Sequence, residues 1–278
     1  MLLLCGLLGW LTLRHLLRPL RDLENGVQAV AEGNLETRLS ESGRDELAGL
    51  GRSFNTMAHR LKDRERARDQ LLLDVSHELR SPLTRMRVAL EMMDQTPLID
   101  NIRDEVEALG KMVSEILETE RLKSPAGLLK VQPEDLVGLI FQKKARFESI
   151  PPGISWTPPA DFPHVPMDME RMRLVIRNLI ENALKYGAEA EKPIEITLHR
   201  EGKFAVLKVR DFGPGVAKDE QDMVFEPFYR LDRSRSRTPG YGLGLPLCRR
   251  IVEAHGGSIA LSGERGEGAT ITVKLPLA

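Results

Sequence analysis

Cysteine is scarce in this sequence: Cys5 and Cys248 are the only two in 278 residues. This number excludes a scaffold held by several disulfides, and the wide separation gives no paired spacing for a metal site. An excess of charge is also lacking, because 40 basic residues face 41 acidic ones and the net charge is −1. A dedicated nucleic-acid binder normally carries a clear basic excess, so no direct contact with nucleic acid is expected.

Helix-breaking and aromatic residues are scarce in the first 124 residues. Of 17 prolines, 14 come at or after residue 125, and of 13 aromatic residues, 11 come at or after residue 141. Long helices tolerate few prolines in their interiors. The first part of the chain is therefore predicted to form long helices and the remainder a mixed globular domain, within the few domains that this length allows.

The chain also lacks an apolar run long enough for a complete membrane helix. Residues 1–13 are apolar apart from Thr12, whereas a span needs about 20 such residues. A signal-peptide core or a buried helix would be the alternatives, but arginines follow this run instead of preceding it, and no small-residue cleavage site is evident. Arginines directly after an apolar segment are typical of the cytoplasmic flank of a membrane helix. Residues 1–13 are therefore interpreted as part of a transmembrane helix.

Two short apolar ladders follow at heptad-like spacing. The first comprises Leu16, Leu20, Leu23, Val27 and Val30, and the second comprises Leu47, Leu50, Phe54, Met57 and Leu61. Two amphipathic helices with one seam each need partners, either in a larger core of the same chain or as a four-helix bundle with a second chain. With Pro19 at the first ladder and Asp45-Glu46 opening the second, this region resembles a HAMP domain, the relay module of bacterial membrane receptors.

A second pair of helices is predicted between residues 63 and 122, with a break near Thr96-Pro97. Its second helix has a continuous apolar stripe, which predicts a hairpin that dimerises into a four-helix bundle. The stripe on its first helix consists of Val75, Leu79, Leu83, Met86 and Leu90. His77 lies about 160° from Leu79 by helical geometry, so it should be reachable from solvent or by another domain.

The residues around His77 favour phosphoryl chemistry over a plain surface histidine. Glu78 supplies a carboxylate that can take a proton from the imidazole, and a His-Glu-x-x-His zinc motif is excluded because its fifth position is Ser81. Residues 76–83, Ser-His-Glu-Leu-Arg-Ser-Pro-Leu, closely resemble the H box of sensor histidine kinases. The resemblance implies that His77 accepts the phosphoryl group and Glu78 acts as the base. It also implies that Ser81 orients water when the partner is dephosphorylated.

Helices and strands are mixed after a short linker at residues 124–127. The predicted helices lie near 134–149, 169–186 and 245–255, and the predicted strands near 154–157, 194–200, 204–211, 258–262 and 270–275. Sheet and helices in this proportion predict an α+β sandwich.

Four segments of this part carry polar or glycine-rich patterns. No Gly-x-x-x-x-Gly-Lys-Ser/Thr string occurs, and Asp211-Phe212-Gly213 lacks the other motifs of eukaryotic-type protein kinases. Residues 178–186 place amides and a lysine on one helical face, which suits either a magnesium–phosphate site or a merely solvated face. Residues 211–215 combine a carboxylate with glycines, residues 225–230 are aromatic, and residues 240–245 join a glycine lid to a helix start that favours phosphate.

In this order the four segments resemble the N, G1, F and G2 boxes of the histidine kinase ATP-binding domain, a relative of the Hsp90, gyrase and MutL ATPases. The resemblance implies ATP and Mg²⁺ as cofactors, with Asn182 and Asn178 on the metal and Asp211 on the adenine amino group. Phe212 replaces the usual small or polar residue, and Phe225 and Phe228 suit core packing equally well. The residues implied to bind the nucleotide are Asn178, Asn182, Lys185, Tyr186, Asp211, Gly213, Gly215, Phe225, Phe228, Arg230, Gly240, Gly242, Leu243, Gly244, Leu245 and Thr270.

These resemblances predict a multidomain protein in which an all-α HAMP domain and a dimerising helical hairpin precede an α+β sandwich. The expected boundaries are 1–13 for a partial transmembrane helix, 14–66 for HAMP, 67–124 for the phosphotransfer hairpin and 128–278 for the ATP-binding domain.

The function predicted from these parts is that of a sensor histidine kinase. It would phosphorylate His77 from ATP and pass the phosphoryl group to an aspartate of a response regulator receiver domain, with dephosphorylation of that regulator as an additional activity. We expect a homodimer anchored in the bacterial inner membrane through its N-terminal helix, with HAMP and kinase domains in the cytoplasm. Two alternatives stay open: an ATPase of the Hsp90 and MutL type, which needs no H box, and a non-catalytic dimeric receptor, which needs no nucleotide motifs.

Overall fold

The computed structural model describes residues 20–31, 33–40, 46–122, 129–147, 149–188, 190, 192–231 and 241–277. These residues fall into two compact units, one up to Leu73 and one from Asp74 onwards. The expected membrane segment, residues 1–13, lies outside the described residues. Among the helices of the described ranges, none is long and apolar enough to cross a membrane.

The first unit contains two helical stretches, residues 20–31 and the beginning of α2 (Glu46–Glu91). The segment between them is fixed to α2 by Asn55, whose side-chain amide donates to the Leu39 carbonyl oxygen and accepts from the Leu39 N–H, each at 2.9 Å. Gly26 packs closely here, because a Cβ at this position would lie 3.1 Å from Leu39 and 3.2 Å from Phe54. Leu39 of the connecting segment thus contacts both helical stretches.

The apolar ladders of this unit remain largely exposed. Phe54 is buried, but Leu20, Val27, Leu50 and Met57 are between 44% and 50% exposed. A seam that one chain leaves uncovered in this way fits the expectation that these helices need partners.

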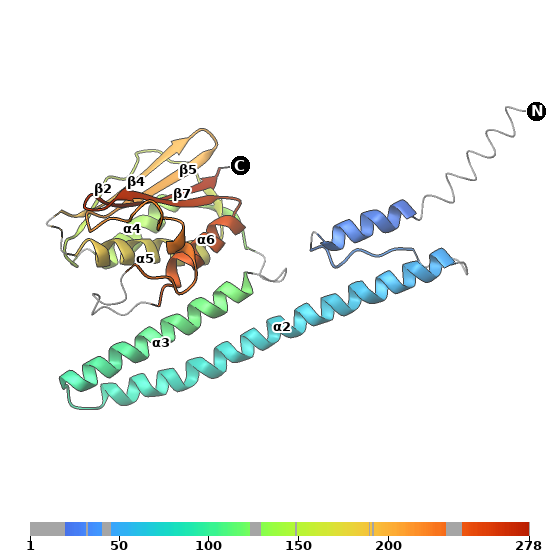
Figure 1. Ribbon diagram of the computed structural model, residues 1–278, viewed down its shortest axis with the longest axis horizontal. Helices are drawn as coiled ribbons and strands as arrows, with labels where there is room; N and C mark the ends of the chain where they lie inside the picture. The colour runs from blue at the N-terminus through green and yellow to red at the C-terminus, as the bar shows by residue number, and fades with distance from the viewer. Residues whose placement is uncertain are drawn as a thin grey trace, which may run out of the picture. The chain divides into compact units, whose positions relative to one another are not determined.

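Helix α2 runs without interruption from the second ladder into the phosphotransfer hairpin (Figure 1). The predicted separate helix start near residue 63 is therefore wrong. Residues 62–70 are mostly polar, but seven of the nine are the good helix formers Lys, Arg, Glu, Gln and Ala, so their propensity continues the helix between the two apolar patterns. The helix also passes through Pro82, which removes only one backbone donor.

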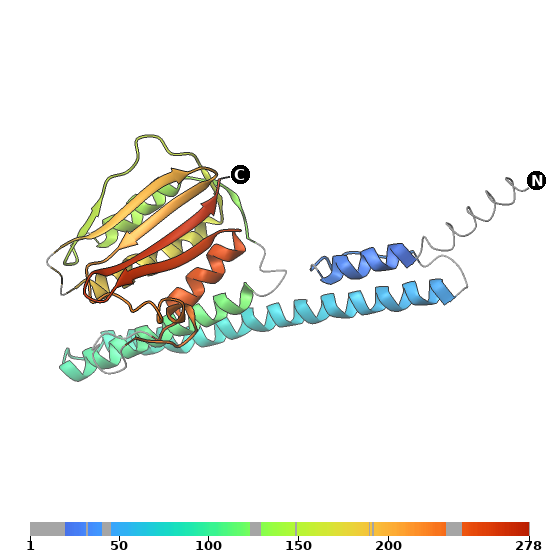
Figure 2. The ribbon, with the colours of Figure 1, turned by 45° about the horizontal axis from the view of Figure 1, so that its top comes forward.

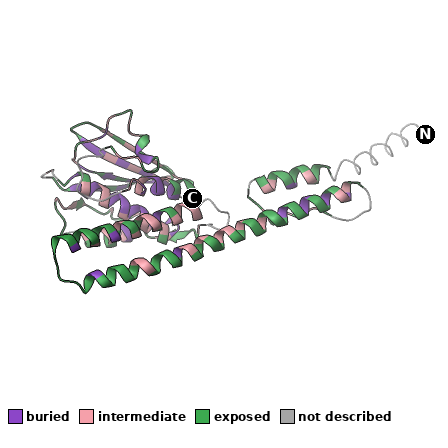
Figure 3. Cartoon of the chain, turned by 60° about the horizontal axis from the view of Figure 1, so that its bottom comes forward, coloured by how far each residue is buried: buried purple, intermediate pink, exposed green. Residues whose placement is uncertain are grey.

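Helix α3 (Pro97–Arg121) folds back alongside α2 (Figure 1). It begins where predicted, because Thr96 caps it by accepting the Ile99 N–H at 3.3 Å and Pro97 occupies the first turn. Leu83 and Leu90 of α2 pack against α3. Leu79 and Met86 of the predicted stripe are instead 40% and 51% exposed, and Figure 3 shows how much of α2 is uncovered.

The rest of the second unit is a sheet with helices on one face (Figures 1 and 2). The five-stranded sheet has the order β2-β4-β5-β7-β6, in which only the β2–β4 pair is parallel. Its strands are β2 (Ile154–Trp156), β4 (Ile194–Glu201), β5 (Phe204–Arg210), β6 (Ser258–Glu264) and β7 (Gly268–Pro276). The covering helices are α4 (Leu136–Phe147), α5 (Met169–Tyr186) and α6 (Gly244–Ala254).

The predicted α+β sandwich is confirmed by this arrangement. Alternate residues of β4, β5 and β7 point into one core with α4, α5 and α6, and this core includes Ile176, Leu179, Ile251 and Val273. Three short elements were not predicted: β1 (Gln132–Glu134), its antiparallel partner β3 (Val165–Met167) and the 3₁₀ turn η2 (Met223–Phe225). Three-residue elements are too short to show a periodic pattern.

Candidate functional site

His77 lies exposed on α2, as its position off the apolar stripe predicted. Glu78 and Ser81 are also exposed, and Ser81 follows His77 by about one turn on the same side of the helix. The Ser81 Oγ accepts a hydrogen bond from Arg85 Nη1 at 2.5 Å. An accessible imidazole, a carboxylate and a hydroxyl are thus presented by one short stretch of α2.

Helix α5 carries the amides of the expected nucleotide site. Asn178 is only 2% exposed, and the backbone of Gly244 packs against it, because a Cβ there would lie 3.5 Å from Asn178 Oδ1. Asn182 and Lys185 are half-buried, and Lys185 Nζ lies 5.3 Å from the centre of the Tyr186 ring. Asn182 is therefore the more accessible of the two amides.

Positive charge converges at the C-terminal end of α5. Burial lowers the pKa of Lys185, and the charges of Arg230 and Lys111 lower it further. Burial also raises the pKa of the neighbouring Tyr186 hydroxyl. Cations that repel one another in a partly desolvated site are stabilised when a polyanion such as a triphosphate binds among them.

Asp211 follows β5 and is held by the backbone of two loops. Its Oδ1 accepts the N–H of Gly213 at 3.0 Å and the N–H of Ala269 at 3.2 Å. Asp211 is 8% exposed, and its burial raises the pKa of the carboxyl group. The backbone hydrogen bonds lower this pKa, but the effect of burial is larger. Because Oδ1 already accepts two backbone hydrogen bonds, Oδ2 is the oxygen that remains able to accept a hydrogen bond from a ligand.

Two glycines allow the chain to approach itself around Asp211. A Cβ on Gly213 would lie 2.1 Å from the Tyr186 carbonyl oxygen, so only glycine fits against the end of α5. Gly215 has a φ of +68°, and a Cβ there would lie 1.9 Å from the Glu264 carbonyl oxygen. These contacts join the α5 motif, the Asp211 loop and the β6–β7 turn into one site.

The aromatic and glycine-rich segments border this site at the start of α6. Phe225 is 5% exposed and packs with Val216, Val224 and Ala269, so it belongs to a small core, whereas Phe228 is 60% exposed. Phe228 has a φ of +65°, and its N–H donates to the Gly242 carbonyl oxygen at 3.0 Å. The first turn of α6, from Gly244 and Leu245, has no side-chain cap, and Leu243 before it is buried. Gly240 lies outside the described residues.

Thr270 and Phe212 are neighbours of the Asp211 contacts, but their side chains are placed differently from Asp211. In β7, Ile271 and Val273 point into the core, so Thr270 points to the opposite face of the sheet. In β5, Val209 points into the core, and Asp211, two residues later, continues on that inner side. The N–H of Ala269, a backbone group that residue types do not reveal, contacts Asp211 instead. The centre of the Phe212 ring lies 4.9 Å from the Arg210 guanidinium carbon and 5.5 Å from Lys192 Nζ, and Asp211 keeps its hydrogen bonds to the backbone.

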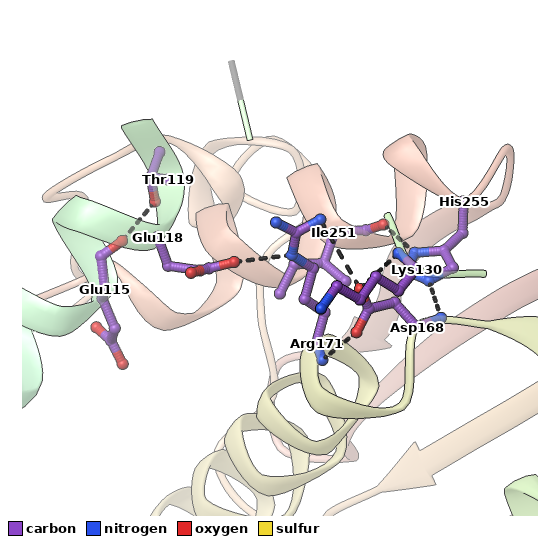
Figure 4. Close-up of polar contacts among 8 residues, drawn as sticks. All are labelled: Glu115, Glu118, Thr119, Lys130, Asp168, Arg171, Ile251 and His255. Atoms are coloured by element: carbon purple, nitrogen blue, oxygen red, sulfur yellow. Dashed lines mark hydrogen bonds and ion pairs between the residues drawn. The ribbon is translucent and has the colours of Figure 1, made fainter. Parts of the chain in front are cut away.

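A buried polar cluster at the other end of α5 and α6 was not predicted (Figure 4). Asp168 caps α5 by accepting the Arg171 N–H at 3.2 Å and also accepts the Lys130 N–H at 2.9 Å. Burial opposes its charge, but these backbone donors hold the pKa of Asp168 below its ordinary value. The N–H of Asp168 donates to His255 Nε2 at 2.8 Å, and His255 Nδ1 lies 2.7 Å from the Ile251 carbonyl oxygen. His255 must therefore be neutral, with its proton on Nδ1.

Within the second unit, α3 contacts the surface of α5 through charged pairs. Arg171 Nε lies 2.9 Å from Glu118 Oε1, and both side chains are less than one-fifth exposed (Figure 4). Lys111 Nζ lies 2.5 Å from Glu181 Oε2. Between them, burial raises the pKa of Glu115. Contacts between residues 53 and 70 positions apart leave no trace in local sequence patterns.

The neutral His255 predicts a pH-dependent stability. Burial places its pKa below the ordinary 6.5, so the unfolded chain binds this proton more readily than the folded one. The free energy of unfolding should therefore be at its full value above about pH 6.5 and decline as the pH falls below it. Urea unfolding between about pH 7.5 and 5.5 should show this slope, and His255→Gln should reduce it. His199→Gln, on an exposed residue of β4, should leave the slope unchanged; equal slopes in all three proteins would contradict this assignment.

Comparison with known proteins shows which family the chain belongs to. Three family models match successive parts of the chain: "HAMP domain" over residues 11–63, "His Kinase A (phospho-acceptor) domain" over residues 67–125, and "Histidine kinase-, DNA gyrase B-, and HSP90-like ATPase" over residues 167–278. The chain is 35% identical over 265 residues to the adaptive-response sensory kinase SasA of Prochlorococcus marinus, covering 88% of this chain and 67% of SasA. The chain belongs to the sensor histidine kinase family.

Other relatives agree with this assignment. The signal transduction histidine-protein kinase BaeS of Escherichia coli is 34% identical over 99% of this chain, which spans 61% of BaeS. The crystal structure of full-length ShkA in complex with AMPPNP superposes with a TM-score of 0.63 at 28% identity, covering 75% of this chain and 46% of ShkA. The chain thus spans about half to two thirds of the length of these relatives.

Proposed function

We propose that this chain is the signalling and catalytic part of a sensor histidine kinase that transfers the γ-phosphoryl group of ATP to His77. The observation that carries the proposal is the combination, in one chain, of an exposed His77 beside Glu78 and a site built around Asp211 and the amides of α5. An ATPase of the Hsp90 and MutL type would need only the second of these features. A non-catalytic receptor would need neither.

In this proposal the residues of the ATP-binding domain hold and orient the nucleotide. Asp211 Oδ2 accepts the adenine amino group, Lys185 and Arg230 attract the phosphates, and Gly242, Gly244 and Leu245 let backbone N–H groups approach them. Tyr186, Gly213 and Gly215 shape the pocket. The buried Phe225 and exposed Phe228 support the lid, whereas the position of Thr270 favours a role in the sheet over contact with adenine.

The amides of α5 fit a magnesium ion that is bound together with the nucleotide. The described residues contain no cluster of three His, Cys, Asp or Glu side chains suited to a metal, so amide and phosphate oxygens would be its ligands. Asn182 is partly accessible, and Asn178 is buried on the same helix with its amide beside the backbone of Gly244. The metal would neutralise charge on the phosphates.

The partners proposed for the chain follow from its exposed surfaces and family. The uncovered seams support a homodimer, and an aspartate of a response regulator receiver domain would take the phosphoryl group from His77. Ser81 would orient water for the reverse function, dephosphorylation of the regulator. The proposed layout keeps a partial membrane helix at 1–13, HAMP at 14–66, the hairpin at 67–124 and the ATP-binding domain at 128–278, anchored at the bacterial inner membrane with its domains in the cytoplasm.

A double-label experiment tests the proposed reaction. Incubation with Mg²⁺ and ATP labelled in the γ-phosphate should label the chain, whereas ATP labelled in the α-phosphate should not. The label should be stable in alkali and lost in acid, as expected of a phosphorus–nitrogen bond. ATP turnover without label on the chain would favour the ATPase alternative, and failure to bind ATP would favour the receptor.

A further inference from the structure

Arg121, the last residue of α3, contacts the residue that precedes His77. Its Nη2 donates a hydrogen bond to Ser76 Oγ at 3.2 Å, across the hairpin from α3 to α2. Ser76 is 7% exposed and immediately precedes His77. A residue outside the H box therefore holds a guanidinium group at the level of His77.

This guanidinium group has no counter-ion among the described residues. No carboxylate of the described ranges lies within ion-pair distance of Arg121, and its Nε is buried without a hydrogen-bond partner. By contrast, Arg103 on the same helix pairs with Asp100 at 2.7 Å, and Arg171 pairs with Glu118. Buried donors without partners destabilise a protein, so such a group is suited to an anion that is present only part of the time.

We propose that Arg121 binds the phosphoryl group on His77, an inference that rests on the kinase activity proposed above. In the transfer, a nitrogen of His77 bonds to the γ-phosphorus while the bond between that phosphorus and the β–γ bridging oxygen breaks. ADP leaves, and Glu78 takes the imidazole proton. The non-bridging oxygens carry negative charge throughout, and guanidinium groups bind such oxygens with two parallel hydrogen bonds. Arg121 thus stabilises both the transfer and its product.

The test compares Arg121→Ala and Arg121→Lys with Arg103→Ala as a matched control on the same helix. Loss of a charge-assisted hydrogen bond should reduce kcat of autophosphorylation roughly 10- to 100-fold in Arg121→Ala. KM for ATP should stay unchanged, because the nucleotide is bound by other residues. The kcat of Arg121→Lys should lie between those of the wild type and Arg121→Ala, since lysine keeps the charge but not the forked geometry.

An equilibrium measurement separates this role from a structural one. At a fixed ratio of ATP to ADP, the labelled fraction of the chain should fall in Arg121→Ala and recover in part in Arg121→Lys, because the phosphorylated product itself loses a contact. Wild-type labelled fraction in both variants would overturn the inference, as would a change in KM alone. Circular dichroism would show whether Arg121→Ala is unfolded. In that case the labelled fraction of Arg121→Lys tests the inference. Absence of label from the wild type would instead refute the proposed function.

Discussion

Replacing His77 by glutamine should reduce incorporation of the γ-phosphoryl group to the level of a blank reaction. The amide of glutamine is no nucleophile towards phosphorus, whereas the imidazole is activated by a neighbouring base. His77 is exposed on α2 and does not belong to the hairpin core, so the substitution should leave the helix content and the melting temperature unchanged. The measurement is filter-bound radioactivity after incubation with γ-labelled ATP.

His59→Gln provides the matched control for this variant. His59 lies on the same helix and is also exposed, with its Nδ1 2.8 Å from Asp63. It should label like the wild type. If His77→Gln retained labelling equal to that of His59→Gln, another residue would be the acceptor.

Asp211→Asn should weaken ATP binding by about 10- to 100-fold. The variant loses one hydrogen bond to the base and places two buried hydrogen-bond donors against each other. The side chains are isosteric, and Asn Oδ1 can still accept the N–H groups of Gly213 and Ala269, so the fold should persist. The nucleotide-facing oxygen becomes an NH₂ group, which would meet the adenine amino group donor to donor. Calorimetric titration with Mg²⁺–ATP measures the change.

Asp219→Asn serves as the control for charge, because Asp219 is exposed in the loop that follows. Its affinity for ATP should equal that of the wild type. Equal affinity of Asp211→Asn and the wild type would show that Asp211 does not contact the base. A fall in kcat without a change in affinity would also contradict the assigned role.

Features that depend on residues close together in the sequence could be predicted. The bounds of α5 were predicted from the local sequence and the position of His77 off the apolar stripe from helical periodicity, and the structure agrees with both. The glycines at 213 and 215 were expected to let the backbone approach a ligand, and the structure shows them lying against two carbonyl oxygens of the chain itself, those of Tyr186 and Glu264. For the helix bounds and for His77, the physical cause acts within a few residues of the chain, whereas the two glycines contact carbonyl groups that are distant in sequence.

Features set by register or by distant contacts could not be predicted in this way. The orientation of Thr270 depends on the pairing of β7 with β5, and its sequence neighbours do not reveal which face it takes. The contact of Asp168 with His255 joins residues 87 positions apart. Asp168 could have been recognised as a helix cap from the Asp-x-Glu pattern that opens α5, but its buried partner could not.

Direct location of the phosphoryl group tests the central claim. After reaction with Mg²⁺–ATP, digestion with trypsin at neutral to alkaline pH cleaves after Arg68 and Arg80 and releases the peptide 69–80, in which His77 is the single histidine. Mass spectrometry should find one phosphoryl group on this peptide, assigned to His77 and removed by brief acid treatment. An acid-stable phosphoryl group on Ser76, a phosphoryl group confined to another peptide, or ATP hydrolysis with no modified peptide would contradict the account.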